Sequence, residues 1–171
     1  MRSANDEMVT TPLTEEQVWS VLRKVPDPEI PDISITELGI VREIRTGHDT
    51  VTVVVTPTYS GCPATEVIAS SICDALEAAG AGSVQIETRL SPPWTSDWLA
   101  PEAPEKLREY GIAPPGARTV SHAVRFVPPV PECPRCGEKK TTRVSEFGAT
   151  ACKAFYRCPS CLEPFEYFKP F

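Results

Sequence analysis

The sequence lacks a long apolar run and any segment typical of export. No stretch reaches the roughly 18 apolar residues that a membrane-spanning helix needs. The opening residues, Met1 to Glu7, contain no apolar core of the kind found in a secretory signal. We therefore expect a cytoplasmic protein with no membrane partner.

Positive charge is also scarce. Lys and Arg number 17 against 23 Asp and Glu, which gives a formal net charge of −6. Neutralisation of phosphates by Lys and Arg supplies most of the affinity for nucleic acid, so an acidic chain without a long basic run is a poor nucleic-acid binder. The same acidity argues against binding to an anionic membrane surface.

The length and the cysteine content bound the architecture. A chain of 171 residues suits one domain of about 100–150 residues plus a smaller unit. Its hydrophobic fraction of 41% is ordinary for a globular protein, so a core can form. In a reducing compartment, seven cysteines more readily serve as metal ligands or reactive thiols than as disulfides.

Hydrophobic periodicity predicts an α+β domain in the first half of the chain. Thr14 and Gln17 form a capping box at the start of a first helix, and Pro26 ends that helix. The order helix, hairpin, helix, strand predicts a small mixed sheet with helices on one face. The expected elements are helices from Thr14 to Val25 and from Pro63 to Ala79, a hairpin of Ile40 to Arg45 with Val51 to Val55, and a strand from Val84 to Leu90.

Composition divides the chain into four segments. Residues 1–12 are expected to be a disordered lead-in, 13–92 the α+β domain, 93–130 a Pro/Trp-rich connector and 131–171 a small zinc-ribbon-like β module. The connector holds Trp94 and Trp98 and is too aromatic for a free linker, so we expect it to pack on the first domain. Within it, Pro104 to Tyr110 is expected to form a short helix and Thr119 to Val127 a strand.

Two matching C-P-x-C motifs indicate a metal site near the end of the chain, formed by Cys133, Cys136, Cys158 and Cys161. Each two-residue spacer lets a tight turn point both thiolates at one ion, and Gly137 follows the first motif, where a turn needs a positive φ. Four thiolates in a closed tetrahedron suit structural Zn²⁺, which would also supply the folding energy of so small a module. Iron in the same cage, or free and redox-active thiols, are the alternatives.

Cys62 lies at the expected N-terminus of the second helix, where the helix dipole and free N–H groups are expected to lower the pKa of its thiol. Asp27, Glu29 and Asp32 lie in a stiff proline-rich loop that could come near it. A thiolate beside carboxylates suits a transient metal or iron–sulfur ligand. It suits a hydrolase less well, because neither of the two histidines offers an evident base. The residues alone leave open whether Cys62 binds metal or only fills a tight helix start.

Two further cysteines belong to neither group. Cys73 lies inside the expected second helix, and we expect it in the core. Cys152 is either a buried small hydrophobic residue, the interpretation we favour, or a reactive thiol.

Three motifs in order identify a resemblance over residues 14–92 to the iron–sulfur-assembly domain once classed as domain of unknown function 59. They are Asp27-Pro28-Glu29-Ile30-Pro31, Leu38-Gly39-Ile40-Val41 and Thr56-Pro57-Thr58-Tyr59-Ser60-Gly61-Cys62-Pro63. In that family the acidic residues of D-P-E and the cysteine before proline are the functional positions. The resemblance thus implies that Asp27, Glu29 and Cys62 form a transient iron or iron–sulfur site.

A wider resemblance covers nearly the whole chain from Leu13. The runs from Ser91 to Trp98 and from Leu107 to Pro115, together with Cys152-Lys153-Ala154 and Glu163-Pro164-Phe165, resemble the accessory D subunits of bacterial phenylacetyl-CoA epoxidases. Such an enzyme is a multicomponent di-iron oxygenase with an Fe–S flavin reductase. The resemblance implies that the chain acts in phenylacetate catabolism and that its partners are the oxygenase and reductase subunits.

Our leading hypothesis is a maturation factor, a binding protein rather than an enzyme. It would assist insertion of iron or an Fe–S cluster through Cys62, and one such thiol per chain would allow a homodimer to share a cluster between two Cys62 thiols. One alternative is a structural subunit of the oxygenase that handles no metal. Another is an enzyme that uses Cys62 as a nucleophile.

Overall fold

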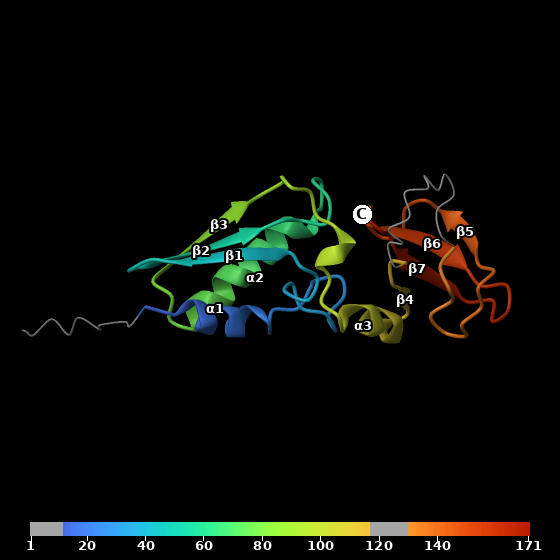
Figure 1. Cartoon of the computed structure of the whole chain (residues 1–171), viewed down its shortest axis with the longest axis horizontal. Coiled ribbons are helices and arrows are strands. Elements are labelled where there is room, and N and C mark those ends of the chain that lie inside the picture. Colours follow the sequence, from blue (N-terminus) through green and yellow to red (C-terminus); the bar gives the residue numbers. More distant parts are fainter. Residues whose placement is uncertain (1–11, 117–129) are drawn as a thin grey trace, which may run out of the picture.

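The computed structural model of the chain describes residues 12–116 and 130–171. Two small sheets lie at opposite ends of an elongated molecule, and the connector runs between them (Figure 1). The expected lead-in falls outside the described residues except for its last position, and the strand expected from Thr119 to Val127 falls outside them entirely. None of the helices in the described ranges has the length and apolar character needed to cross a membrane.

The N-terminal sheet is mixed, as predicted. Strand β1 (Val41–Thr46) pairs antiparallel with β2 (Thr50–Val55), and β2 pairs parallel with β3 (Ser83–Thr88). Helices α1 (Glu15–Leu22) and α2 (Ala64–Ala78) both lie on one face of this sheet (Figure 1). The α+β class and the helix–hairpin–helix–strand order are therefore confirmed.

Local sequence explains both helices. The N–H of Gln17 donates to Thr14 Oγ1 at 3.3 Å, and the N–H of Thr14 donates to Gln17 Oε1 at 2.8 Å, which is the expected capping box. In α2 the buried residues recur every four positions, which places them on the face that meets the sheet. They are Ala64, Ile68, Ile72 and Leu76.

The first helix ends earlier than predicted. The α-helix stops at Leu22, and Val25 lies beyond it although its side chain is buried. The carbonyl of Val25 instead accepts a hydrogen bond of 3.0 Å from the N–H of Ile35. This bond, together with the isolated bridge between Pro26 and Ser34, folds the proline-rich loop back on itself. Helix α2 ends at Ala78, so Ala79, the last residue of the expected second helix, lies just beyond it and is exposed.

The connector holds a 3-10 turn, η1 (Ser96–Trp98), the helix α3 (Ala103–Tyr110) and a two-residue strand, β4 (Ile112–Ala113). Trp94 is buried in the same core as α1 and α2, and its Nε1 donates to the carbonyl of Leu38 at 2.9 Å. The helix agrees with the expected one, whereas η1 and β4 were not foreseen.

The C-terminal sheet has the strand order β4-β7-β6-β5. Strands β5 (Thr142–Ser145) and β6 (Lys153–Arg157) form an antiparallel pair between the two C-P-x-C motifs, and β7 (Pro164–Phe168) pairs antiparallel with β6. Strand β4 adds to β7 in parallel, so the connector contributes to this sheet. Phe168 and Cys152 point away from it and join the core of the N-terminal sheet.

Candidate functional site

The two C-P-x-C motifs have the same backbone geometry. The N–H of Cys133 donates to the carbonyl of Glu138 at 2.9 Å, and the N–H of Cys158 donates to that of Glu163 at 3.0 Å. In each motif the residue after the second cysteine has a positive φ, of 75° at Gly137 and 65° at Leu162. The glycine was predicted to need this conformation. At Leu162 the same turn forces a side chain into the left-handed region, which costs energy.

The four thiols of these motifs gather at one point. Their sulfur atoms all lie within 4.8 Å of one another, with Cys133 3.7 Å from Cys161 and Cys136 3.5 Å from Cys158. A tetrahedron with metal–sulfur bonds of about 2.3 Å has edges of about 3.8 Å, so the donor set fits one metal ion. Although burial raises the pKa of Cys158, N–H groups of Cys161 and Ser160 donate to its sulfur and lower that pKa to about 7.

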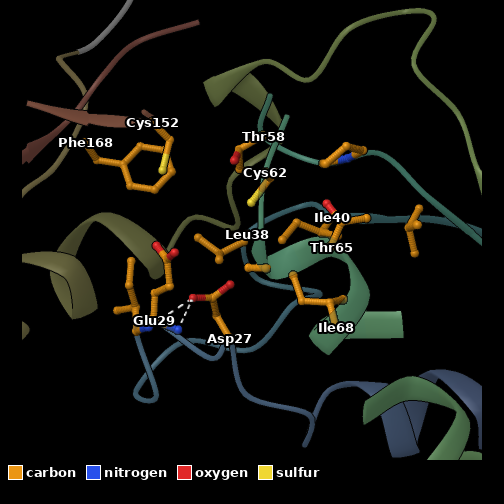
Figure 2. A pocket seen from close by; sticks show the side chains of 14 residues that line it. Asp27, Glu29, Leu38, Ile40, Thr58, Cys62, Thr65, Ile68, Cys152 and Phe168 are labelled. Carbon is orange, nitrogen blue, oxygen red and sulfur yellow. Dashed lines mark hydrogen bonds between the residues drawn. The ribbon is translucent and has the colours of Figure 1, made fainter. Parts of the chain in front are cut away.

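A second cluster of polar side chains lines a cavity of about 30 Å³, enough for about one water molecule. The cavity lies where the proline-rich loop, the N-terminus of α2 and the C-terminal sheet meet. Cys62, Asp27 and Glu29, the residues singled out from the sequence, all line it. Figure 2 shows the sulfur atoms of Cys62 and Cys152 pointing toward this same cavity from opposite sides.

Asp27 fixes the loop that carries it. Only 7% of this residue is exposed, and its Oδ1 accepts hydrogen bonds from the N–H groups of Glu29 and Ile30 at 2.9 and 3.0 Å. Burial raises the pKa of Asp27, although the two N–H donors and the charge of Lys153 oppose that rise. The second carboxylate oxygen points into the cavity (Figure 2).

Glu29 belongs to a polar network that crosses from the loop to the C-terminal sheet. Its Oε2 accepts a hydrogen bond of 3.0 Å from Thr150 Oγ1 and lies 3.7 Å from Lys153 Nζ. Lys153 Nζ also pairs with Glu166 at 2.9 Å, and the lysine side chain is only 4% exposed. The buried ammonium of Lys153, between two carboxylates, therefore joins the C-terminal sheet to the loop.

The pKa of the Cys62 thiol was expected to be lowered and is raised. Burial is the largest cause, and the negative charges of Glu29 and Asp27 add to it. The N–H of Ala64 lowers the pKa, as expected for a thiol at a helix N-terminus, but it is outweighed. Cys62 is therefore a protonated thiol at neutral pH, and a metal must displace the proton to bind it.

The contribution of Cys152 to this cavity was not predicted from the sequence. Cys152 is 5% exposed, which fits the favoured interpretation of a buried residue, yet it lines the cavity with Cys62. Burial raises the pKa of its thiol as well.

The prediction that Cys73 lies in the core was wrong, because this residue is half-buried on α2 and lies outside the core cluster. Asp32 is exposed and does not line the cavity.

A histidine base near Cys62 is absent from the described part of the chain. His48 lies in the exposed turn between β1 and β2, paired with Asp49 at 3.0 Å, and His122 falls outside the described residues. Neither Asp27 nor Glu29 makes a hydrogen bond to the Cys62 sulfur among the contacts of the described residues.

Two family models match the chain. Residues 15–88 match the iron-sulfur cluster assembly protein family, and residues 117–169 match the PaaD zinc beta ribbon domain. The first covers α1, α2 and the N-terminal sheet, together with the loops that carry Cys62, Asp27 and Glu29. The second covers all four thiols of the C-P-x-C motifs.

Curated relatives and solved structures agree with the family models. The chain is 50% identical over 153 residues to the putative D subunit of the 1,2-phenylacetyl-CoA epoxidase of Escherichia coli (strain K12), covering 90% of this chain and 91% of the relative. It is 36% identical over 92 residues to the Fe-S protein maturation auxiliary factor of Porphyromonas gingivalis, covering 53% of this chain and 87% of that relative.

The fold of the N-terminal part recurs in two solved structures. One is the domain of unknown function DUF59 from Bacillus anthracis, with a TM-score of 0.51 and 24% identity over 54% of this chain and 90% of the other. The second is a conserved hypothetical protein from Thermotoga maritima, with a TM-score of 0.50 and 31% identity over 58% of this chain and 98% of the other.

Proposed function

We propose that this chain, which belongs to the family of 1,2-phenylacetyl-CoA epoxidase D subunits, is an accessory factor that helps insert iron or an Fe–S cluster into partner subunits of such an epoxidase. The partners would be the oxygenase and its Fe–S flavin reductase. The chain would act as a binding protein and not as an enzyme. The match to an Fe-S protein maturation auxiliary factor supports the maturation role.

The observation that carries this proposal is the cavity that holds Cys62, Asp27 and Glu29. A thiol and two carboxylates offer one soft and two hard ligands, a set that suits iron. The ligand atoms of Cys62, Asp27 and Glu29 are spaced more widely than the sulfur atoms of the four-thiol set. Among the described residues, that set alone gathers three or more ligand atoms within 4.8 Å of one another.

We assign the four-thiol site to structural Zn²⁺. All four positions are taken by thiols, so no position remains for a substrate, as in structural zinc sites. The ion would hold the C-terminal sheet against the loop of Glu29. Elemental analysis of the purified chain tests this assignment, and one iron with no zinc per chain would reverse it.

Production of the client with and without Cys62 tests the maturation role. The oxygenase and reductase would be produced in a host that supplies this chain as wild type, Cys62→Ala or Cys73→Ala. Cys73 lies on α2 outside the core cluster and serves as the matched thiol control. We expect full iron in the client with wild type and Cys73→Ala, and under-metallated client with Cys62→Ala. Fully loaded, fully active client from the Cys62→Ala strain would end the proposal.

A second candidate function follows from the name of the Escherichia coli relative, which is called a subunit of the epoxidase. In this alternative the chain stays in the complex as a structural part. It predicts stoichiometric amounts of the chain in the purified oxygenase, together with client iron that does not depend on Cys62.

A further inference from the structure

The cavity beside Cys62 is completed by a residue from the far end of the chain. Cys152 lies in the turn before β6, within the C-terminal module, and its sulfur points into the cavity that also holds Cys62 and Glu29 (Figure 2). The four thiols of the C-P-x-C motifs form a complete set without it. Cys152 is therefore a fifth thiol of this module, which the closed metal site does not use.

The position of Cys152 is fixed by polar contacts across the interface. Thr150 Oγ1 lies 3.1 Å from the Cys152 sulfur and donates to Glu29 Oε2 at 3.0 Å, so one hydroxyl joins the thiol to the carboxylate. The next residue, Lys153, is buried and lies 3.7 Å from the same carboxylate. These contacts bring a thiol of the C-terminal module and a carboxylate of the proline-rich loop to one cavity.

The chemistry of the lining differs from that of ordinary core. Asp27 and Glu29 are each paired within the fold, which offsets the cost of burying their charge, and the cavity gathers these two carboxylates with two thiols among apolar side chains. Two thiolates with a carboxylate form a mixed soft and hard set, which suits ferrous iron or an iron–sulfur cluster more than Mg²⁺ or Ca²⁺.

We propose that Cys152 is a second thiolate ligand of the iron site, so that Cys62 from the turn before α2 and Cys152 from the C-terminal module hold one iron centre together, with Glu29 as an oxygen ligand. The ligand atoms of these three residues do not all lie within 4.8 Å of one another in the structure, so they would draw closer together when iron binds. This inference rests on the proposed function, because it assumes that Cys62 binds iron. It adds that the zinc-ribbon-like module supplies part of the cargo site. Binding breaks two S–H bonds, forms two Fe–S bonds and releases two protons to solvent, with no change of oxidation state.

Anaerobic titration of the full-length, zinc-loaded chain tests the second thiolate. Ferrous iron would be added to wild type, Cys62→Ser, Cys152→Ser and the control Cys73→Ser, followed by desalting and analysis of iron and zinc in the same sample. We expect Cys152→Ser and Cys62→Ser each to bind iron at least about 10-fold more weakly than wild type. Cys73→Ser is expected to match wild type, and zinc is expected to stay at one per chain throughout.

A measurement on the wild-type chain covers the case in which Cys152→Ser fails to fold. Co²⁺ bound by thiolates absorbs in proportion to the number of thiolates, and the four-thiol site provides an internal standard. Co²⁺ placed in the cavity of zinc-loaded protein should show about half the thiolate absorption of Co²⁺ placed in the four-thiol site. Two thiolates in the cavity would give half of the absorption of the four-thiol site, whereas Cys62 alone would give a quarter of it.

The outcomes separate this inference from the function on which it rests. Iron binding that is lost in Cys62→Ser and kept in Cys152→Ser, or a quarter of the standard absorption, would overturn the second ligand and leave the proposed function standing. No iron binding by wild-type protein would overturn both. Loss in both variants with half the standard absorption supports the shared site.

Discussion

Thr150 Oγ1 donates a hydrogen bond of 3.0 Å to the carboxylate of Glu29, although 121 residues separate them in the chain. The contact joins the C-terminal sheet to the loop that carries the D-P-E motif. Beside it, Lys153 is buried between Glu29 and Glu166. The cavity of Cys62 therefore depends on how the two sheets dock, and several testable consequences follow from that dependence.

Replacing Lys153 should destabilise the docking of the two sheets. In Lys153→Met the carboxylates of Glu29 and Glu166 lose their shared buried partner, and breaking a buried pair in this way costs about 3 kcal/mol. Thermal or urea unfolding would measure the loss. Lys139→Met is the control, because Lys139 pairs with Glu132 at 3.4 Å with a side chain that is 79% exposed, and little change is expected there. Equal stability of the two variants would contradict the role given to Lys153.

Gly39 should tolerate no side chain. Its φ is +68°, and a Cβ at this position would lie 2.4 Å from the carbonyl oxygen of Trp98, where the connector crosses the loop. Gly39→Ala should cost about 3 kcal/mol or more, from backbone strain and the displaced connector. Gly80→Ala is matched for strain, with φ +97° and open space around the new Cβ, and should cost about 1 kcal/mol. Similar losses of unfolding free energy in Gly39→Ala and Gly80→Ala would show that the contact with Trp98 is unimportant.

Removal of the metal from the four-thiol site should open the Cys62 cavity. A module this small depends on its metal for folding, and its loss frees Phe168 and Cys152, both of which line the cavity. Chelation should raise the alkylation rate of Cys62 and leave that of Cys73 unchanged, as read by peptide mass spectrometry. The helical circular dichroism of α1 and α2 should persist. An unchanged rate at Cys62 would show that the cavity does not need the module.

Glu37 should make stability depend on pH below neutrality. Burial alone would raise its pKa, but hydrogen bonds from Lys106 and Ser34 outweigh burial and lower that pKa below 4.5 in the folded protein. A folded pKa below the unfolded one stabilises the fold above the unfolded pKa, and this stability is lost as pH falls through the folded pKa. Glu37→Gln should thus cost about 1 kcal/mol at pH 7.

The difference between wild type and Glu37→Gln should shrink as pH falls below about 4.5, because the wild-type carboxylate then becomes protonated. Urea unfolding at several pH values would measure it. A difference that stays constant from pH 7 to pH 3 would contradict the assigned cause.

Features that depend on neighbouring residues were predictable from the sequence. The capping box of Thr14 and Gln17, the positive φ of Gly137 and the four-residue repeat of α2 all follow from contacts within a few positions. The four-thiol set was predictable because two short turns each fix a pair of sulfur atoms. The approach of Cys62 to Asp27 and Glu29 was expected from the resemblance and from the stiffness of the loop.

Features that depend on how distant parts of the chain pack together could not be predicted from the sequence. The pKa of Cys62 was misjudged because the N–H of Ala64 is local, whereas the burial and the carboxylate charges that outweigh it come from other elements. The pairing of β4 with β7 and the entry of Cys152 into the cavity join residues far apart in the chain. No periodicity or spacing encodes such contacts.

Metal analysis of anaerobically purified protein tests most directly the central claim that Cys62 holds iron in transit. Wild type, Cys62→Ala and Cys73→Ala would be analysed for zinc and iron before and after cluster reconstitution. We predict one zinc per chain in all three, with sub-stoichiometric iron that is present in wild type and Cys73→Ala and lost in Cys62→Ala. Iron that is equal in all three proteins, or absent from wild type even after reconstitution, would contradict the claim.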